Sequence, residues 1–377
     1  MAGIYLHVPF CKQACYYCDF HFSTNQRYVK EMTEALCAEL KLQKDYLHHE
    51  PVKTIYFGGG TPSLLTDEQL RRILDIIKSN YSIAGDPEIT LEANPDDLTP
   101  EKLESLRQIG INRLSIGIQS FNQDVLKYLN RAHDRGQALR CFENARKAGF
   151  NNISIDLIYA IPADSHDNWH QDLDQALELQ PEHISSYSLT IEPKTTFGNW
   201  LRKGNIPPID EEFSATQFEI LMERLTQADY EQYEVSNFCK PGYYSRHNSG
   251  YWKQEKYLGI GPSAHSYDGV NRRFNISHNP KYMKAIAESE IPYEEDILTD
   301  EDRINEYLLT TLRTKWGADL GKMAYKWEYD LLSEQGAYLE RLFAKNYAII
   351  DDNHLKLTKS GFLLADKISS DLFKIKI

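Results

Sequence analysis

The segment Ile4–Phe20 reads IYLHVPFCKQACYYCDF, a β-rich run that ends at a proline and continues into a loop with three cysteines. The cysteines, Cys11, Cys15 and Cys18, follow the spacing Cys-x3-Cys-x2-Cys. Three thiolates on one short loop can surround a metal cluster but leave one metal ion without a protein ligand. An open coordination position is typical of sites that exchange a ligand or perform chemistry. The segment therefore predicts a first strand that leads into a reactive metal site.

Beyond this segment, β-rich runs alternate with segments of helical period up to about residue 240. The expected strands are Gly3–Val8, Lys53–Phe57, Glu88–Ala93, Arg113–Ile118, Ile153–Ile158, His183–Leu189 and a weaker one near Tyr233–Val235. The expected helices are Tyr28–Tyr46, Thr66–Asn80, Thr99–Ile109, Arg135–Ala148, Trp169–Leu179 and Glu211–Ala228. This alternation predicts an α/β fold, a partial (β/α)6-type barrel of six or seven units, with reactive residues at the carboxyl ends of its strands.

The pattern changes after about residue 290. The elements expected there are helices over Asp300–Lys315, Met323–Glu328 and Gly336–Lys345, strands Tyr347–Ile350 and His354–Leu357 flanking a turn, and a last helix over Lys359–Asp371. Helices followed by a small hairpin are typical of a compact winged-helix-like α+β unit. We therefore expect two domains, a core over residues 1–290 and a C-terminal domain over residues 291–377.

Charge and hydropathy exclude several classes of protein. The formal net charge of -13 argues against a broad basic face for nucleic acid or anionic lipid. No apolar stretch is long enough to span a bilayer, and the N-terminal run MAGIYLHVPF lacks the features of a signal peptide. We expect a cytoplasmic protein with no transmembrane segment and no nucleic-acid partner.

The reducing cytosol favours metal binding over disulfides for the clustered cysteines. A structural zinc site made by Cys11, Cys15, Cys18 and His21 is compatible with the residue types. The scattered Cys37 and Cys141 lie in helical patterns, and we expect them to be small core hydrophobes.

The Cys-x3-Cys-x2-Cys spacing directly after a first strand resembles the signature of the radical-SAM superfamily. The resemblance implies a [4Fe-4S] cluster held by Cys11, Cys15 and Cys18, with S-adenosylmethionine (SAM) chelating the remaining iron. One electron from the reduced cluster would then cleave SAM to a 5'-deoxyadenosyl radical, so that the cofactors carry the difficult chemistry.

Glycines end the second expected strand in the run TIYFGGGTP (54–62), where backbone can approach a ligand closely. The run lacks the features of a phosphate-binding loop. Polar residues recur at the later strands, and a carboxylate there can accept from hydroxyls or an ammonium while an arginine can pair with a carboxylate. Resemblance to the coproporphyrinogen-oxidase-like branch of the superfamily implies a set of residues that bind SAM: Tyr5, Tyr17, Gly59, Gly60, Thr61, Glu92, Gln119, Arg131 and Asp156.

That branch contains oxygen-independent coproporphyrinogen III oxidases and the haem chaperones of the HemW family. The oxidases carry a further cysteine two residues after the last cluster ligand, where this chain has Phe20. They also carry a long extension before the cysteine loop, which here begins at residue 11. Both departures make the chain more similar to the HemW family.

The run RHNSGYW (246–252) matches the HemW pattern His-Asn-x-x-Tyr-Trp, which is associated with haem binding. The haem-binding candidates are therefore His247, Asn248, Tyr251 and Trp252. Haem needs an axial ligand, an aromatic wall and cations for its propionates. His247 is the candidate axial ligand, and Tyr251 or Trp252 is the candidate for the aromatic wall. The candidate cations are Arg246, Arg272 and Arg273. An aromatic loop with one histidine is also typical of a packed corner.

The resemblance implies a haem chaperone in porphyrin metabolism that binds haem, a [4Fe-4S] cluster and exchangeable SAM, and transfers haem to acceptor haem proteins. A flavodoxin or ferredoxin would suit the electron transfer. The alternatives are an oxidase that decarboxylates porphyrinogen propionates through a SAM-derived radical, and a zinc-stabilised barrel with an unrelated role. We expect a radical-SAM scaffold without coproporphyrinogen oxidase activity, and we assign no catalytic residue.

Overall fold

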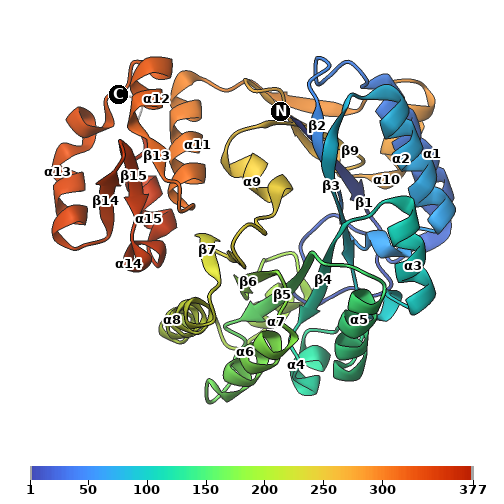
Figure 1. Cartoon of the computed structure of the whole chain (residues 1–377), viewed down its shortest axis with the longest axis horizontal. Helices are drawn as coiled ribbons and strands as arrows, with labels where there is room; N and C mark the ends of the chain where they lie inside the picture. Colours follow the sequence, from blue (N-terminus) through green and yellow to red (C-terminus); the bar gives the residue numbers. More distant parts are fainter. Residues whose placement is uncertain (1, 375–377) are drawn as a thin grey trace.

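The computed structural model describes residues 2–374 of the chain. Its main element is a curved, open sheet of twelve strands in the order β12-β11-β10-β9-β1-β2-β3-β4-β5-β6-β8-β7 (Figure 1). The strands β1 to β6 lie side by side and parallel. They are Ala2–Val8, Val52–Gly59, Ile83–Ala93, Arg113–Gln119, Ile153–Tyr159 and His183–Ser188. The predicted partial barrel of α/β units is confirmed.

Helices connect or follow these strands, and most of them lie outside the curved sheet, whereas α4 and α7 pack beside the cysteine loop (Figure 1). They are α1 (Val29–Leu42), α2 (Asp67–Asn80), α3 (Pro100–Ile109), α4 (Gln123–Tyr128), α5 (Arg135–Lys147), α6 (Asp167–Leu179), α7 (Thr196–Arg202) and α8 (Glu211–Gln227). Helix α2 begins at a complete capping box, in which Thr66 accepts from Gln69 N, and it buries Leu70, Ile73 and Ile77 against the sheet. Cys37 and Cys141 are each 2% exposed within the same core, as expected.

The two ends of the sheet differ from the predicted alternation. At one end, β8 (Asn237–Cys239) and β7 (Glu231–Glu234) are antiparallel, so the weak strand near Tyr233–Val235 forms an edge and not a seventh unit of the barrel. At the other end, β9 (Lys256–Ile260) is parallel to β1, and a meander of antiparallel strands follows. The meander consists of β10 (His265–Tyr267), β11 (Arg272–Asn275) and β12 (Tyr293–Asp296), with α10 (Asn279–Ala287) before the last strand. The main sheet thus runs to Asp296, beyond the expected boundary at residue 290.

The segment 246–252, expected as a loop, is a short helix, α9 (Arg246–Trp252). Ser245 caps its first turn, and the buried carboxylate of Glu88 accepts from the backbone N–H groups of Arg246 and His247 at 3.0 Å each. Negative charge at a helix N-terminus stabilises the helix. Helix α9 lies between the strands β1 and β2 and the C-terminal part of the chain (Figure 1).

The C-terminal part is a small α+β unit with its own hydrophobic core, formed by buried residues between Ile304 and Leu372. Its elements are α11 (Asp300–Leu312), β13 (Ala318–Asp319), α12 (Leu320–Trp327), α13 (Leu331–Ala344), β14 (Ala348–Asp351), β15 (His354–Leu357), α14 (Lys359–Phe362) and α15 (Ala365–Asp371). The expected last helix is split into α14 and α15, because Leu364 leaves the helical conformation at φ -117° and ψ 16°. The appended α+β unit itself is as predicted.

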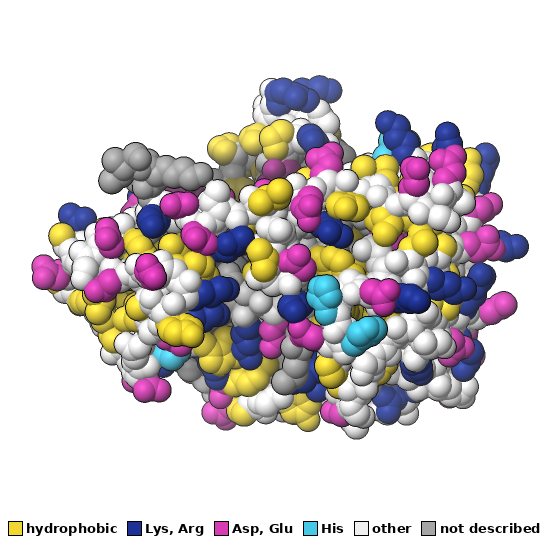
Figure 2. Space-filling model, turned by 90° about the horizontal axis from the view of Figure 1, so that it is seen from above, with side chains coloured by type: hydrophobic (Ala, Val, Ile, Leu, Met, Phe, Trp, Pro, Cys, Tyr) yellow, Lys and Arg dark blue, Asp and Glu magenta, His cyan; other side chains and the backbone are white. Residues whose placement is uncertain are grey.

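On the face in Figure 2, basic and acidic side chains are mixed and form no broad field of one sign. Within residues 2–374, no helix is long and apolar enough to cross a membrane.

Candidate cofactor site and adjoining cleft

The cysteine loop lies at the carboxyl end of β1, and its three cysteines are half-buried free thiols. Burial raises the pKa of Cys11 to about 11 and that of Cys18 to about 12. Thiols in such surroundings need a bound cation to become thiolates. Within residues 2–374, no three His, Cys, Asp or Glu side chains are gathered around the position of a single ion. The loop is compatible with a cluster, in which each thiolate binds a different iron.

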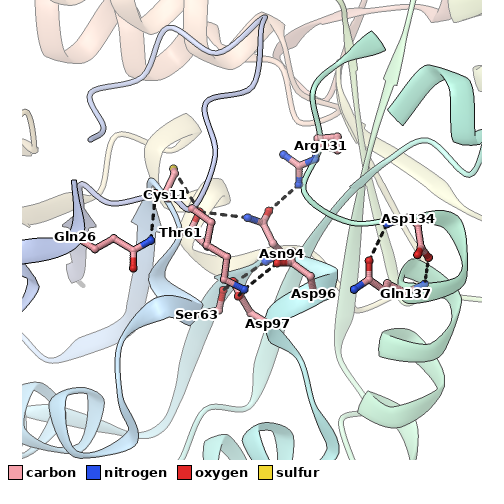
Figure 3. Close-up of polar contacts among 11 residues, drawn as sticks. Cys11, Gln26, Thr61, Ser63, Asn94, Asp96, Asp97, Arg131, Asp134 and Gln137 are labelled. Atoms are coloured by element: carbon pink, nitrogen blue, oxygen red, sulfur yellow. Dashed lines mark hydrogen bonds and ion pairs between the residues drawn. The ribbon is translucent and has the colours of Figure 1, made fainter. Parts of the chain in front are cut away.

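A chain of hydrogen bonds connects Cys11 to Cys15 through side chains of three different loops. Figure 3 shows the part of this chain from Cys11 to Arg131. Thr61 Oγ1 donates to Cys11 Sγ at 3.3 Å and accepts from Asn94 Nδ2 at 3.3 Å. Asn94 Oδ1 accepts from Arg131 Nη2 at 2.6 Å, and Arg131 Nη1 donates to Cys15 Sγ at 3.2 Å. Both sulfur atoms thus face a hydrogen-bond donor, which stabilises the negative charge of cluster ligands.

Arg131 makes further contacts that hold the loop. Its guanidinium donates to Gly117 O at 2.7 Å and to the Tyr17 hydroxyl at 3.3 Å. Its Nε atom is buried and has no hydrogen-bond partner among the described residues. The Arg131 guanidinium therefore joins the cysteine loop to the ends of β3 and β4, and its Nε–H group has no acceptor. A β-carbon on Gly117 would lie 3.0 Å from Gln119 Nε2 and 3.2 Å from Arg131 Nη2. The Gln119 amide and the Arg131 guanidinium therefore both lie beside Gly117.

The glycines at the end of β2 form a close cradle. Gly59 has a φ of +104°, and a β-carbon there would lie 2.6 Å from the His7 ring. A β-carbon on Gly60 would lie 2.6 Å from the Phe10 carbonyl oxygen. Larger residues would therefore push β2 away from the start of the cysteine loop.

Two half-buried carboxyl groups face the interior of the barrel. Glu92 accepts from the Tyr56 hydroxyl at 2.8 Å and from Gly59 N at 3.1 Å. Burial, with a contribution from the nearby Asp156, raises the pKa of Glu92 to about 7. Burial likewise raises the pKa of Asp156 to about 6. Neighbouring carboxyls of this kind favour a cationic ligand between them, because a cation stabilises both in the charged form.

The structure brings the residues expected to bind SAM to one end of the barrel. Gln119 ends β4 with a φ of +69°, a left-handed conformation that non-glycine residues adopt mainly where the surroundings impose it. Tyr5 is the one half-buried residue of β1 and stacks on Tyr56. Asn94 was missed by the sequence interpretation, although its position directly after β3, within the run LEANP, was a signal of the same kind as Glu92.

A cleft of about 680 Å³ adjoins this site. This volume is within the range of ligand pockets. The lining comes from β1, from the end of the cysteine loop with Phe20, from α9 and the residues between it and β9, from the hairpin β10–β11, and from α11 with Leu309. Phe20 is 68% exposed and Leu309 is 37% exposed, so large apolar surfaces face the cleft.

The residues of the segment 246–252 divide between the cleft and the core. Tyr251 and Trp252 line the cleft, whereas His247 is 3% exposed. His247 Nδ1 lies 2.8 Å from Thr54 Oγ1 and Nε2 lies 2.8 Å from the Tyr251 hydroxyl. The imidazole stacks on Tyr56, and burial lowers its pKa to about 3. Asn248, on the same helix, does not line the cleft.

Of the three arginines expected near haem, Arg272 lines the cleft. Arg246 lies beside Asp86 and Glu88 outside it. Arg273 packs on the rings of Tyr46 and Tyr293. Successive residues of a strand point to opposite faces of the sheet, which separates Arg272 from Arg273 on β11.

The sequence profile of the Radical SAM superfamily matches residues 5–176, which contain the cysteine loop and the glycine cradle. Over 373 residues the chain is 37% identical to the haem chaperone HemW of Bacillus subtilis, with 98% of both chains covered. The chain belongs to the HemW family. It is also 35% identical to HemW of Mycobacterium tuberculosis over 376 residues, covering 97% of this chain and 93% of the relative. Membership of this family within the radical SAM superfamily implies a [4Fe-4S] cluster and SAM as cofactors.

The fold of this HemW-family chain is that of coproporphyrinogen III oxidase (HemN) from Escherichia coli, a radical SAM enzyme. The two structures superpose with a TM-score of 0.85 over 99% of this chain and 90% of the oxidase, at 24% identity. The donor set of the HemW-family chain fits its family's cofactors: three thiols on one loop, hydrogen-bond donors at two of them, a glycine cradle and carboxyls that favour a cation.

Proposed function

We propose that this chain is a cytoplasmic haem chaperone, which binds haem, holds a [4Fe-4S] cluster with exchangeable SAM, and transfers haem to acceptor haem proteins. The observation that carries the proposal is Phe20. It takes the place of the oxidases' additional cysteine and exposes an aromatic ring in a cleft beside the cofactor site. An exposed aromatic ring can bind an apolar macrocycle such as haem by packing against it. A radical reaction would instead need precisely placed polar groups.

For the cluster, we propose Cys11, Cys15 and Cys18 as the ligands. The hydrogen-bond chain from Cys11 to Cys15 supports this assignment, because it stabilises thiolates without supplying a fourth protein ligand. When bound, the cluster and SAM supply one-electron radical chemistry.

For SAM, the proposal uses the cradle and the barrel interior. Gly59, Gly60 and Thr61 leave room for the methionine part, while Glu92 and Asp156 face its positive charges or its ribose hydroxyls. The remaining residues of the proposed set are Tyr5, Tyr17, Gln119 and Arg131. The unpartnered Nε atom of Arg131 leaves a donor for the carboxylate of SAM after small side-chain movements.

For haem, we propose the cleft. Tyr251 and Trp252 form one wall, with His247 and Asn248 behind them on α9. Helix α11 of the C-terminal unit forms another wall, so both of the domains that we propose, dividing near residue 290, contribute to haem binding. We propose a flavodoxin or ferredoxin as the electron donor and other haem proteins as acceptors.

The proposal is tested by incubating the anaerobically reconstituted, reduced protein with SAM and coproporphyrinogen III, followed by separation of the porphyrins. We expect no protoporphyrinogen. A parallel incubation with haem should give a complex that survives gel filtration. Formation of protoporphyrinogen would make the chain an oxidase, and an iron-free, zinc-containing preparation after anaerobic purification would indicate the zinc-stabilised barrel.

A further inference from the structure

We infer that His265 supplies the axial nitrogen to the iron of bound haem, and that His247 of the family motif is a positioning residue behind the haem cleft. This inference rests on the proposed haem-binding function. It assigns the ligand to a histidine outside the RHNSGYW run, on the hairpin β10–β11 that lines the same cleft.

The state of the ring nitrogens distinguishes the histidines of this region. A haem ligand must present a nitrogen lone pair that no other group occupies. His7 has Nδ1 3.2 Å from the Tyr5 hydroxyl and Nε2 2.8 Å from the His21 carbonyl oxygen. His21 has Nε2 2.7 Å from Asn279 Oδ1, and its Nδ1 atom has no hydrogen-bond partner within residues 2–374. His247 is engaged at both nitrogens and is buried.

His265 differs from His7 and His247 in its ring nitrogens and from His21 in its greater exposure. Its side chain lines the cleft and is exposed, and neither ring nitrogen has a hydrogen-bond partner within residues 2–374. Partial burial and the nearby Arg272 lower the pKa of His265, which favours the neutral imidazole that binds metals.

The register of the hairpin places complementary groups beside His265. His265 is opposite Phe274, and Tyr267 is opposite Arg272, in the antiparallel pair β10–β11. Residues that are opposite each other, or two apart on a strand, share one face of the sheet. His265, Tyr267 and Arg272 therefore face the cleft together, which gives a nitrogen ligand, an aromatic ring and a cation for a propionate.

The hairpin also fixes the backbone of His265. The His265 ring lies 5.6 Å from the Phe274 ring at an angle of 31°. Ser266 Oγ accepts from Gly259 N at 2.9 Å, and a β-carbon on Gly259 would lie 2.0 Å from the His265 carbonyl oxygen. The strands β9 and β10 are thus in close contact at this point, and a fixed backbone gives the imidazole a defined direction.

His247 acts through Tyr251. Its Nε2 atom bonds the Tyr251 hydroxyl, and Tyr251 lines the cleft. Replacing His247 would therefore disturb haem binding through the position of Tyr251, without removing a ligand of the iron.

The test is spectroscopic and uses the full-length, cluster-loaded protein titrated with ferric haem. The variants are His265→Ala and His247→Ala, with His21→Ala as a second histidine of the cleft and His170→Ala on α6, outside the cleft, as the matched control. The readouts are the Soret band and the electron paramagnetic resonance (EPR) signal of ferric haem, each recorded with and without added imidazole.

We expect His265→Ala alone to change the Soret maximum and the EPR signal, and imidazole to restore both towards those of the wild type. His247→Ala should keep the spectrum at saturation and bind haem at least several-fold more weakly. An unchanged spectrum in His265→Ala, or loss of the histidine signature in His247→Ala or His21→Ala, would overturn the inference. Failure of the wild type to bind haem would instead overturn the proposed function, so the two failures are distinguishable.

Discussion

The Nδ1 atom of His247 lies 2.8 Å from the Oγ1 atom of Thr54, and this contact fixes helix α9 against the second strand of the barrel. The imidazole fills a buried position between Tyr56 and Tyr251. His247 of the family motif is therefore part of the protein core. Tyr251, one helical turn later, is the motif residue that contacts it and lines the cleft.

Replacing His247 by alanine should lower the free energy of unfolding by about 2–4 kcal/mol, because it opens a cavity and leaves two hydroxyl groups without a partner. Tyr251→Phe removes one of these hydrogen bonds and should cost only about 1 kcal/mol. Urea denaturation measures both values. Equal stability of His247→Ala and the wild type would show that the packing around His247 contributes little.

Glu92 should make the SAM-free protein less stable as pH rises. Its folded pKa of about 7 lies above the ordinary value of 4.5, so its contribution is full below about pH 4.5 and is lost as pH rises through 7. The contribution is at most about 3 kcal/mol, and solvent in the open barrel reduces it. Between pH 5 and pH 8, Glu92→Gln should therefore lose less stability than the wild type. A parallel pH dependence in both proteins would contradict the raised pKa of Glu92.

Arg131→Lys should weaken SAM binding about tenfold or more, because an ammonium cannot make the forked contacts to Asn94, Gly117 and Cys15 at once. The EPR signal of the reduced cluster, which changes when SAM binds to iron, measures the effect. Lys147→Arg on α5, away from the cysteine loop, is the matched conservative control. Wild-type SAM affinity in Arg131→Lys would remove Arg131 from the proposed set.

Phe20→Ala should weaken haem binding about tenfold, because it removes apolar surface from the wall of the cleft. Phe20 is 68% exposed, so the change should leave the stability of the haem-free protein nearly unaltered. Tyr325→Ala is the control, since Tyr325 is 93% exposed on α12 and does not line the cleft. Identical haem affinities of the Phe20 and Tyr325 variants would place haem elsewhere.

Arg272 and Glu306 both line the cleft and form an ion pair of 3.1 Å, and their substitutions should act in opposite directions. Arg272→Gln should weaken haem binding about tenfold by removing a partner for a propionate, whereas Glu306→Gln should strengthen binding by freeing Arg272. Haem dimethyl ester, which lacks the propionate charges, should bind both variants and the wild type with similar affinity. The same loss of affinity for the ester in Arg272→Gln would mean that Arg272 contacts another part of the macrocycle.

The sequence predicted the barrel because each of its first six strands carries its own apolar pattern between helices of clear period. The residues proposed to bind SAM come from the family resemblance, and most of them lie on or directly after successive parallel strands, whose carboxyl ends meet at one edge of the sheet. The strands around Gly259 and Gly261 were missed, since a glycine-rich run is typical of a turn. Helix α9 was missed because residues such as Asn248 and Gly250 are poor helix formers, and the carboxylate that caps it, Glu88, is distant in sequence.

The cleft could not be predicted either. Its walls come from the cysteine loop, a hairpin, α9 and α11, and only the packing of the C-terminal unit on the barrel brings them together. For the same reason, the motif histidine and the exposed histidine of the hairpin could not be distinguished by sequence, where His265 is one residue of a glycine-rich run.

The most direct test of haem delivery is the rate at which haem passes from the loaded protein to an apo-acceptor haem protein, followed by the Soret band at several acceptor concentrations. Apomyoglobin in excess gives the rate of passive haem dissociation for comparison. A haem chaperone should give a transfer rate that rises with the concentration of the acceptor and exceeds passive dissociation. A rate that is independent of the acceptor and equal to passive dissociation would contradict it.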